Sequence, residues 1–262
     1  MNDQRSPSRD SDSREWFKDW FNHPLYLKVY SHRDDAEAAQ CVETILRITG
    51  LETAPERTSV LDIACGAGRH AFAFARKGLQ VTANDLSQFL LGTAEEEARK
   101  TGLPISFSGC DMRSLRLERN FDLIVQLFSS FGYFETDAED REVVRNVSQM
   151  LRGNGWYVLD LINPSWLRRH FIPRTDKTVG NLSISEERSL SEDKVVKKIS
   201  ISDTDGHQVA FTESVRLFSP EMIVDILECE GLEVVRIAGD YRGAEFSVDA
   251  SPRMMLFSRK RR

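Results

Sequence analysis

Strand-like and helix-like segments alternate through the middle of the chain. Five short apolar runs predict buried strands, at residues 59–64, 80–85, 105–111, 121–128 and 156–162. Between them, apolar residues at helical spacing predict helices over residues 70–78, 87–102 and 138–155. Ser87 is a suitable N-cap for the second of these helices and Gly102 a suitable C-terminal stop. Because strands joined by such helices form right-handed crossover units, the pattern predicts a mostly parallel sheet with helices on both faces.

The regions on either side of this alternation have other patterns. Residues 16–30 are rich in aromatic side chains. After them, the spacing of apolar residues predicts a helix that buries one face and ends at Gly50. The stretch 181–217 alternates polar and apolar positions around a turn at Asp203–Gly206, which predicts an antiparallel hairpin or small sheet. Three further elements are expected near the C-terminus, a helix over 219–231 with Ser219 as its N-cap and strands over 232–238 and 253–259.

These patterns predict an α/β fold with a doubly wound, mostly parallel sheet and a small antiparallel β insertion. The predicted segments are a disordered tail at residues 1–14, a helical cap at 15–50, the core at 51–180, the antiparallel insertion at 181–217 and the remainder of the core at 218–262. The insertion is expected to be a lid, a dimer element or both, because exposed strand edges pair readily. A homodimer is therefore a prediction.

Composition narrows the class of protein. The 262 residues are 40% hydrophobic and 29% charged, which is ordinary for a globular protein and excludes collagen-like and coiled-coil chains. The net charge of −6 provides no overall positive field for nucleic acid. The four cysteines show neither a CxxC pair nor zinc-ligand spacing, so no structural metal or disulfide framework is indicated. With no signal-peptide run and no stretch of 18 apolar residues, a cytoplasmic protein is expected.

A glycine turn follows the first strand of the alternation directly, in the sequence DIACGAGRH. Gly66 and Gly68 permit tight dihedrals and let a ligand lie against bare backbone, although GAGRHA alone is also a weak match to the dinucleotide fingerprint. Asp62 would repel a pyrophosphate but attract an amine. Asp85 ends the second strand, where a carboxylate can accept from both hydroxyls of a ribose. Asp111 ends the third, near where an adenine amino group would need an acceptor.

This combination resembles the class I S-adenosylmethionine-dependent methyltransferases, more narrowly their small-molecule bacterial members. The resemblance rests on DIACGAGRH, Asp85, Asp111 and the segment FDLIVQLFSSFGYF, in this order, and covers the chain from about residue 15 to residue 260. It implies a Rossmann-like, seven-stranded sheet whose last strand is antiparallel, with the cofactor across the carboxyl ends of the first strands. The implied cofactor is S-adenosylmethionine, and the implied product is S-adenosylhomocysteine.

The resemblance also assigns most of the candidate cofactor-binding residues. It implies that Ala64, Gly66 and Gly68 line the methionine moiety, Asp85 binds the ribose, Asp111 and Met112 contact the adenine, Leu86 packs on the adenine ring, and Leu127 and Phe128 edge the methyl-donor region. In this family the N-terminal segment closes over the cofactor, which makes Tyr26, Tyr30 and Arg33 candidate contacts. The planar guanidinium of Arg33 suits the cofactor carboxylate, while core packing for the tyrosines and a surface position for Arg33 stay open.

Few residues are candidates for the chemistry itself. Tyr133 stands where related sugar-amine methyltransferases have a histidine, and because a phenol is a poor base at neutral pH we expect it to bind or stack on the acceptor, with a catalytic role open. His70 is expected to pack beside the sheet. A basic cluster that could recognise an anionic acceptor, or form only a solvated face, comprises Arg168, Arg169, His170 and Arg174. Tyr241 and Phe246 lie between the last two strands and could reach the mouth of the site.

The predicted activity is direct in-line transfer of a methyl group to a nitrogen or oxygen of a small-molecule acceptor. Alignment and desolvation are expected to supply most of the protein's contribution, so no acid–base dyad or metal need appear in the sequence. Three alternatives stay open. They are a methyltransferase acting on RNA or protein, which the acidic charge disfavours, a nicotinamide-dependent oxidoreductase, which Asp62 disfavours, and a cofactor-binding protein without turnover.

Overall fold

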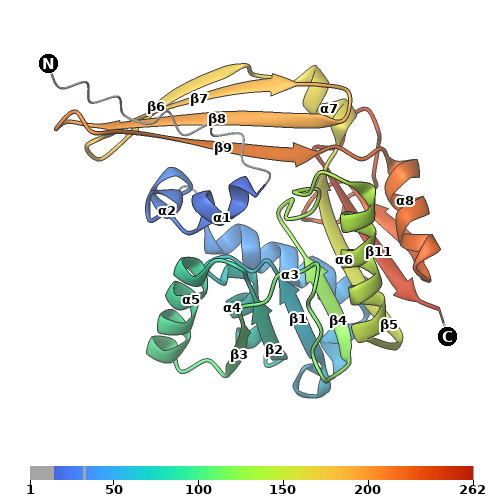
Figure 1. Ribbon diagram of the computed structural model, residues 1–262. Coiled ribbons are helices and arrows are strands. Elements are labelled where there is room, and N and C mark those ends of the chain that lie inside the picture. Colours follow the sequence, from blue (N-terminus) through green and yellow to red (C-terminus); the bar gives the residue numbers. More distant parts are fainter. Residues whose placement is uncertain (1–14, 32–33, 262) are drawn as a thin grey trace, which may run out of the picture.

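Two β-sheets organise the protein, a seven-stranded sheet between layers of helices and a separate four-stranded sheet beside it (Figure 1). The computed structural model describes residues 15–31 and 34–261. The predicted tail at residues 1–14 and the candidate Arg33 lie outside the described residues. Within the described ranges, no helix is long and apolar enough to cross a membrane.

The larger sheet has the predicted doubly wound topology. Its strands are β1 (Ser59–Ile63), β2 (Gln80–Asn84), β3 (Ile105–Ser108), β4 (Phe121–Gln126), β5 (Leu151–Ile162), β10 (Leu232–Ala238) and β11 (Arg253–Lys260), in the spatial order β10-β11-β5-β4-β1-β2-β3. Strands β1 to β5 are parallel, and the last strand, β11, runs antiparallel to both of its neighbours, β5 and β10. The predicted α/β fold class is confirmed, including the antiparallel last strand.

Helices cover both faces of this sheet. The helices of the described residues are α1 (Trp16–Phe21), α2 (Leu25–Val29), α3 (Asp35–Thr49), α4 (Arg69–Arg76), α5 (Gln88–Thr101), α6 (Asp137–Met150), α7 (Pro164–Arg169) and α8 (Pro220–Cys229), with short 3-10 turns at Leu51–Thr53 and Pro55–Arg57. Apolar residues of α3, α4 and α5 pack on one face, and those of α6 and α8 on the other. The side chains of Ser87 and Ser219 cap α5 and α8, and left-handed Gly50 and Gly102 end α3 and α5, as the sequence predicted.

The helix predicted over residues 138–155 is wrong at its C-terminal end. Helix α6 ends at Met150, and Leu151, with extended dihedrals, opens β5. Asn154 has a positive φ of 63°, which a continuing helix cannot accommodate. Gly155 lies so close to the neighbouring strand that an added Cβ would be 3.1 Å from the carbonyl oxygen of Phe121. Close strand packing therefore overrides the helical pattern in these five residues, 151–155.

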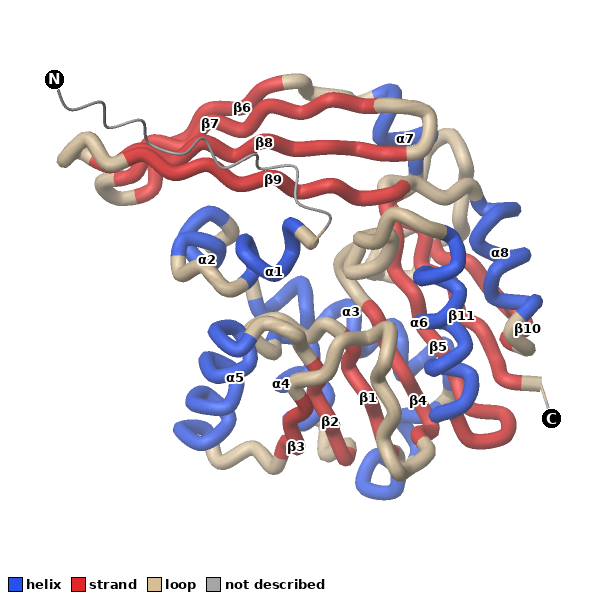
Figure 2. Tube along the Cα trace, in the orientation of Figure 1, coloured by secondary structure: helices blue, strands red, loops and turns tan. Residues whose placement is uncertain are grey.

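The smaller sheet is antiparallel, as predicted for the insertion, but larger than predicted. Its strands are β6 (Arg174–Val179), β7 (Leu182–Leu190), β8 (Lys194–Asp203) and β9 (Gln208–Arg216), in sequential order. It starts seven residues before the predicted position 181, because β6 is nearly all polar and gives no hydrophobic alternation. The predicted turn joins β8 to β9, where Asp203 accepts from the amides of Asp205 and His207. Figure 2 shows this sheet extending over α1 and α2.

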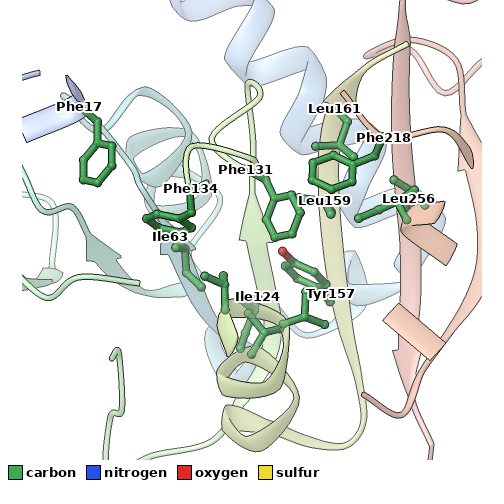
Figure 3. Packing of buried hydrophobic residues seen from close by; sticks show 14 of the residues in the cluster. Phe17, Ile63, Ile124, Phe131, Phe134, Tyr157, Leu159, Leu161, Phe218 and Leu256 are labelled. Carbon is green, nitrogen blue, oxygen red and sulfur yellow. The ribbon is translucent and has the colours of Figure 1, made fainter. Parts of the chain in front are cut away.

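The two sheets share one continuous apolar cluster. Its members on the larger sheet include Ile63, Ile124, Tyr157, Leu159 and Leu256, and Figure 3 shows them packed against aromatic side chains from the loop after β4 and from residue 218. Leu182, Ile184, Ile199 and Ile201 of the smaller sheet belong to the same cluster, as do Trp16, Phe17 and Trp20 of α1. The first helices are thus held between the two sheets, above the carboxyl ends of the parallel strands.

Candidate active site

Two adjoining cavities lie at the carboxyl ends of β1, β2 and β4, where open α/β sheets bind their ligands. One has a volume of about 230 Å³ and the other about 70 Å³. Five residues line both cavities, namely Tyr26, Ala64, Gly66, Ser130 and Tyr133. Helix α1 contributes Phe17 and Phe21 to the smaller cavity, so the N-terminal helices form part of its wall. The two cavities together are the candidate site.

The two glycines of the turn after β1 have different surroundings: Gly66 faces the cavities, and Gly68 faces closely packed side chains. Gly66 has a φ of 59°, and an added Cβ there would meet nothing within 4 Å, so its backbone faces open space in both cavities. Gly68, with φ 87°, is the N-cap of α4 and lines neither cavity. An added Cβ at Gly68 would stand 3.0 Å from the Phe72 ring and 3.2 Å from Ala94. The structure therefore leaves the backbone of Gly66 open to a ligand, whereas Gly68 permits close packing of α4 against α5. The predicted contact of either glycine with the methionine moiety remains a prediction.

Two buried carboxylates stand behind this turn. Asp85 accepts from the backbone amide of Gly66 at 2.7 Å and from that of Ser87 at 2.8 Å, so it fixes the turn and still borders the smaller cavity. Asp62 is only 2% exposed, and one of its carboxylate oxygens has no hydrogen-bond partner. Burial, with the neighbouring charge of Asp85, raises the pKa of Asp62 to about 8. A buried, partnerless carboxylate oxygen lining the larger cavity is a natural place for a cation.

The smaller cavity is a mainly apolar slot. Its lining includes Leu86 and Met112, the two residues predicted to contact the adenine, together with Phe17, Phe21 and Phe134. Flat apolar walls of this kind suit a planar ring.

Asp111 borders the slot, but its carboxylate is already engaged by the guanidinium of Arg113, with an Nη2–Oδ2 distance of 2.6 Å. Although burial raises the pKa of Asp111, the hydrogen bonds from Arg113 hold it below the ordinary value. Arg113 also pairs with Glu15 before α1 and with Glu139 of α6. Arg113 therefore ties the start of the N-terminal helices to the edge of the slot, a link that the sequence did not predict.

The predicted methyl-donor residues line the larger cavity. Leu127 and Phe128 follow β4 and border this cavity, as do Tyr26, Tyr30 and His70. His70 is buried at the start of α4. Its expected packing beside the sheet remains a prediction.

Tyr133 lies inside an aromatic cluster next to both cavities. Its ring meets Trp16 edge-on at 5.1 Å and is stacked with Phe17 at 6.2 Å. The ring thus packs the loop after β4, to which Tyr133 belongs, against the N-terminal helix α1. This position allows Tyr133 to contact a bound molecule, and its catalytic role remains a prediction.

Tyr30 joins the second helix to the smaller sheet. Its hydroxyl donates to Glu213 at 2.5 Å and accepts from Lys197. Trp20 donates to the same carboxylate at 2.7 Å, and Lys197 pairs with it at 2.6 Å. Burial raises the pKa of Glu213, yet Lys197 and these donors hold it below the ordinary value. A charged, largely buried cluster therefore fastens α1 and α2 over the site.

The basic cluster suggested as an acceptor site is not assembled at the cavities. Its four residues face the exterior with separate partners: Arg168 contacts the Glu192 carbonyl, Arg169 pairs with Asp249, His170 stacks on Trp166, and Arg174 pairs with Asp176 and Glu187. None of the four lines either cavity. Phe246 packs against the core, and Tyr241 reaches a buried polar network behind Phe128.

Comparisons with known proteins agree with this geometry. Residues 60–155 match a family described as a methyltransferase domain. A dTDP-3-amino-3,4,6-trideoxy-alpha-D-glucopyranose N,N-dimethyltransferase of Streptomyces venezuelae is 31% identical over 137 residues, covering 50% of this chain and 56% of that protein. A dTDP-4-amino-2,3,4,6-tetradeoxy-D-glucose N,N-dimethyltransferase of Saccharopolyspora spinosa is 27% identical over 210 residues, covering 80% of this chain and 78% of that protein.

A solved structure shows the same fold over nearly the whole chain. An S-adenosylmethionine-dependent methyltransferase from Clostridium acetobutylicum superimposes with a TM-score of 0.77 at 20% identity, covering 92% of this chain and 98% of its own. Together these findings confirm the predicted resemblance to the methyltransferases.

Proposed function

Because the chain has the fold of the class I S-adenosylmethionine-dependent methyltransferases and carries their methyltransferase domain at residues 60–155, we propose that it methylates a nitrogen of a small-molecule acceptor. The observation that carries the cofactor part of the proposal is the buried, partnerless oxygen of Asp62 beside the open backbone of Gly66, and the names of two relatives, both N,N-dimethyltransferases, favour nitrogen. An oxygen acceptor is the second candidate.

The residues at the carboxyl ends of β1 and β2 fit this cofactor. The partnerless oxygen of Asp62 would hold the α-ammonium group, whose charge offsets the cost of a buried carboxylate. The methionine portion of the cofactor would lie against the open backbone face of Gly66. The remaining lone pairs of the Asp85 carboxylate would accept hydrogen bonds from the ribose hydroxyls. Leu86 and Met112 would enclose the adenine. When bound, the cofactor supplies an electrophilic methyl group on a positively charged sulfur.

The chain's own contribution is then alignment and exclusion of water. Helices α1 and α2 cover the site, and the cluster of Tyr30, Glu213 and Lys197 fastens them to the smaller sheet. Holding two reactants in reactive geometry can lower a barrier by about 7–11 kcal/mol. A neutral amine is itself nucleophilic and needs no strong base in the site. We assign Tyr133 a binding role against the acceptor, because it lines both cavities.

A small acceptor is supported by charge and by the relatives. The net charge of −6 does not favour a nucleic-acid partner. The relatives from Streptomyces venezuelae and Saccharopolyspora spinosa are named as N,N-dimethyltransferases of amino-deoxy sugars joined to dTDP. Amino sugars and their nucleotide-linked forms are therefore the first acceptor class to test.

The test uses S-adenosylmethionine with a labelled methyl group and a panel of amino sugars, their dTDP-linked forms, phenols, total tRNA and a protein lysate. Label transfer to an amino sugar, together with formation of S-adenosylhomocysteine, is the expected result. Exclusive transfer to tRNA or protein would overturn the small-molecule assignment. Cofactor binding without transfer to any acceptor would favour a protein without turnover. Asp85→Ala is the matched control, since it removes the proposed ribose ligand.

A further inference from the structure

Two consecutive residues after β4 have an unusual backbone conformation. Phe128 has a φ of 63° and Ser129 a φ of 61°, in the left-handed region that residues with a Cβ seldom adopt. Phe128 also lines the larger cavity. A conformation of this kind persists only where its surroundings hold it, and such positions often occur at functional sites.

Asp160, near the carboxyl end of β5, holds the turn through both of its amides. Its carboxylate Oδ2 accepts from the Phe128 amide at 2.8 Å, and its backbone carbonyl accepts from the Ser129 amide at 3.1 Å. The side chain of Asp160 is fully buried. A single residue of the neighbouring strand thus fixes the direction in which the chain leaves β4.

Arg253, the first residue of β11, completes this arrangement. Its Nε donates to Asp160 Oδ1 at 2.9 Å, its Nη2 lies 2.7 Å from Oδ2, and the same Nη2 donates to the Ser129 hydroxyl at 2.8 Å. The Tyr241 hydroxyl donates to Asp160 Oδ2 at 2.8 Å. Among residues 15–31 and 34–261, every donor to this buried carboxylate comes from the turn itself or from the last part of the chain. The planar guanidinium fork is suited to joining three acceptor atoms at once.

The ring of Phe128 is fixed by the same residues. The Tyr241 ring is stacked with it at a centroid distance of 6.4 Å and an interplanar angle of 21°. The guanidinium carbon of Arg253 lies 5.8 Å from the centroid of the Phe128 ring, and that of Arg69 lies 5.2 Å from it on another element, α4. The backbone and the ring of Phe128 are therefore located by one network.

From this geometry we propose that Asp160, Arg253 and Tyr241 are positioning residues for methyl transfer. They hold Phe128 against the methyl-donor end of the larger cavity. The inference rests on the proposed function and extends it, because it gives the C-terminal part of the chain a role in the site. A reacting group misplaced by about 1 Å can lose about 100-fold in rate, so a rigid support for this wall has a catalytic purpose.

A second buried ion pair provides the matched control. Asp140 of α6 is also fully buried and pairs with Arg216 of β9 at 2.6 Å, yet neither residue lines either of the two cavities of the site. Arg216→Lys weakens this pair by the same chemical change that Arg253→Lys makes in the network. Loss of stability is common to both substitutions, and only the network substitution should alter the site.

The experiment records the ¹³C methyl resonance of S-adenosylmethionine, labelled at the methyl carbon, bound to the full-length protein and its variants. An aromatic ring next to the methyl group shifts this resonance, and Phe128→Leu defines the value without the ring. In Arg253→Lys and Tyr241→Phe we expect the resonance to move measurably toward the Phe128→Leu value. We expect the cofactor Kd to change by less than about threefold. Arg216→Lys should keep the unaltered resonance.

Three results would overturn the inference. The first is a resonance in Tyr241→Phe and Arg253→Lys identical to that of the unaltered protein, and the second is an equal shift in Arg216→Lys. The third is a Phe128→Leu resonance that does not differ from the original, because the ring would then not face the methyl group. Tyr241→Phe removes only a hydroxyl, so it keeps the test decisive if Arg253→Lys does not fold. No bound resonance with the unaltered protein would instead refute the cofactor assignment itself.

Discussion

Replacing Asp62 with asparagine should stabilise the ligand-free protein at alkaline pH while it weakens binding of S-adenosylmethionine. The Asp62 carboxyl is 2% exposed, and one of its oxygens has no partner. Within the part of the chain that the structure describes, the Ala71 backbone hydrogen bond and the charge of Arg69 favour its ionised form, and Asp85 opposes it. The proposed partner of this charge is the ammonium group of the cofactor. Without the cofactor, no cation offsets this charge, so the folded protein keeps the carboxyl protonated up to about pH 8 and bears the cost of a buried charge only above that pH.

The size and sign of the effect follow from the pKa. Burial, followed by the charge of Asp85, raises the pKa of Asp62 from 3.8 to about 8. The folded state therefore holds the proton more tightly than the unfolded chain does, and the free energy of unfolding falls as pH rises from about 4 to about 8. At about 1.4 kcal/mol per pKa unit, the full penalty above pH 8 is on the order of 5 kcal/mol. Asparagine does not ionise, so the variant lacks this dependence.

Urea unfolding of both ligand-free proteins between about pH 5 and about pH 9 measures the difference. Asp140, whose pKa burial raises to about 7, titrates in both proteins and cancels on subtraction. The stability of Asp62→Asn minus that of the unaltered protein should increase by several kcal/mol across this range. A difference that does not change with pH would refute the assignment of Asp62 as a buried, uncompensated charge.

Three further predictions concern neighbouring parts of the site. Asp85→Ala should lower the affinity for S-adenosylmethionine at least about tenfold in calorimetric titration, because charged hydrogen bonds to the ribose are lost; unchanged affinity would contradict its role. Gly66→Ala should abolish cofactor binding, because the added methyl group fills the open backbone face. Gly231→Ala is the control, since Gly231 also has a positive φ and faces open space. Both substitutions should lower the free energy of unfolding by about 1–2 kcal/mol, and Gly231→Ala should leave cofactor binding intact. Tyr30→Phe removes the hydrogen bond from the Tyr30 hydroxyl to Glu213 and should therefore loosen the N-terminal helices. The expected sign is faster amide hydrogen exchange in residues 15–31, and unchanged exchange would argue that this hydrogen bond does not hold the helices. The predicted homodimer remains a prediction that light scattering decides.

Much of the fold could be predicted because its signals are local. Apolar runs mark β1, β2, β4 and β5, which are buried on both faces, and capping residues such as Ser87 and Gly102 mark helix ends. The glycine turn and the acids at strand ends also stand close together in the sequence, so their meeting at one edge of the sheet follows from the parallel order of the strands. These features suffice to place Asp62, Gly66 and Asp85 at one site.

The remaining features depend on contacts between distant residues. Arg253 and Asp160 are 93 residues apart in the sequence, and Tyr30 and Glu213 are 183 residues apart. At such separations no sequence pattern shows which carboxylate a given cation or hydroxyl will contact. The engagement of Asp111 by Arg113 was also missed, although the two are only two residues apart. A strand such as β6, nearly all polar, offers no alternation to read. The sequence therefore predicted which strand ends meet at the cavities but not the network that supports them.

Whether these cavities bind S-adenosylmethionine is decided by calorimetric titration of the purified protein with S-adenosylmethionine, S-adenosylhomocysteine and NAD. The protein should bind the first two ligands with micromolar affinity, Asp85→Ala should lose that binding, and NAD should not bind. Binding of NAD alone would instead assign the site to an oxidoreductase.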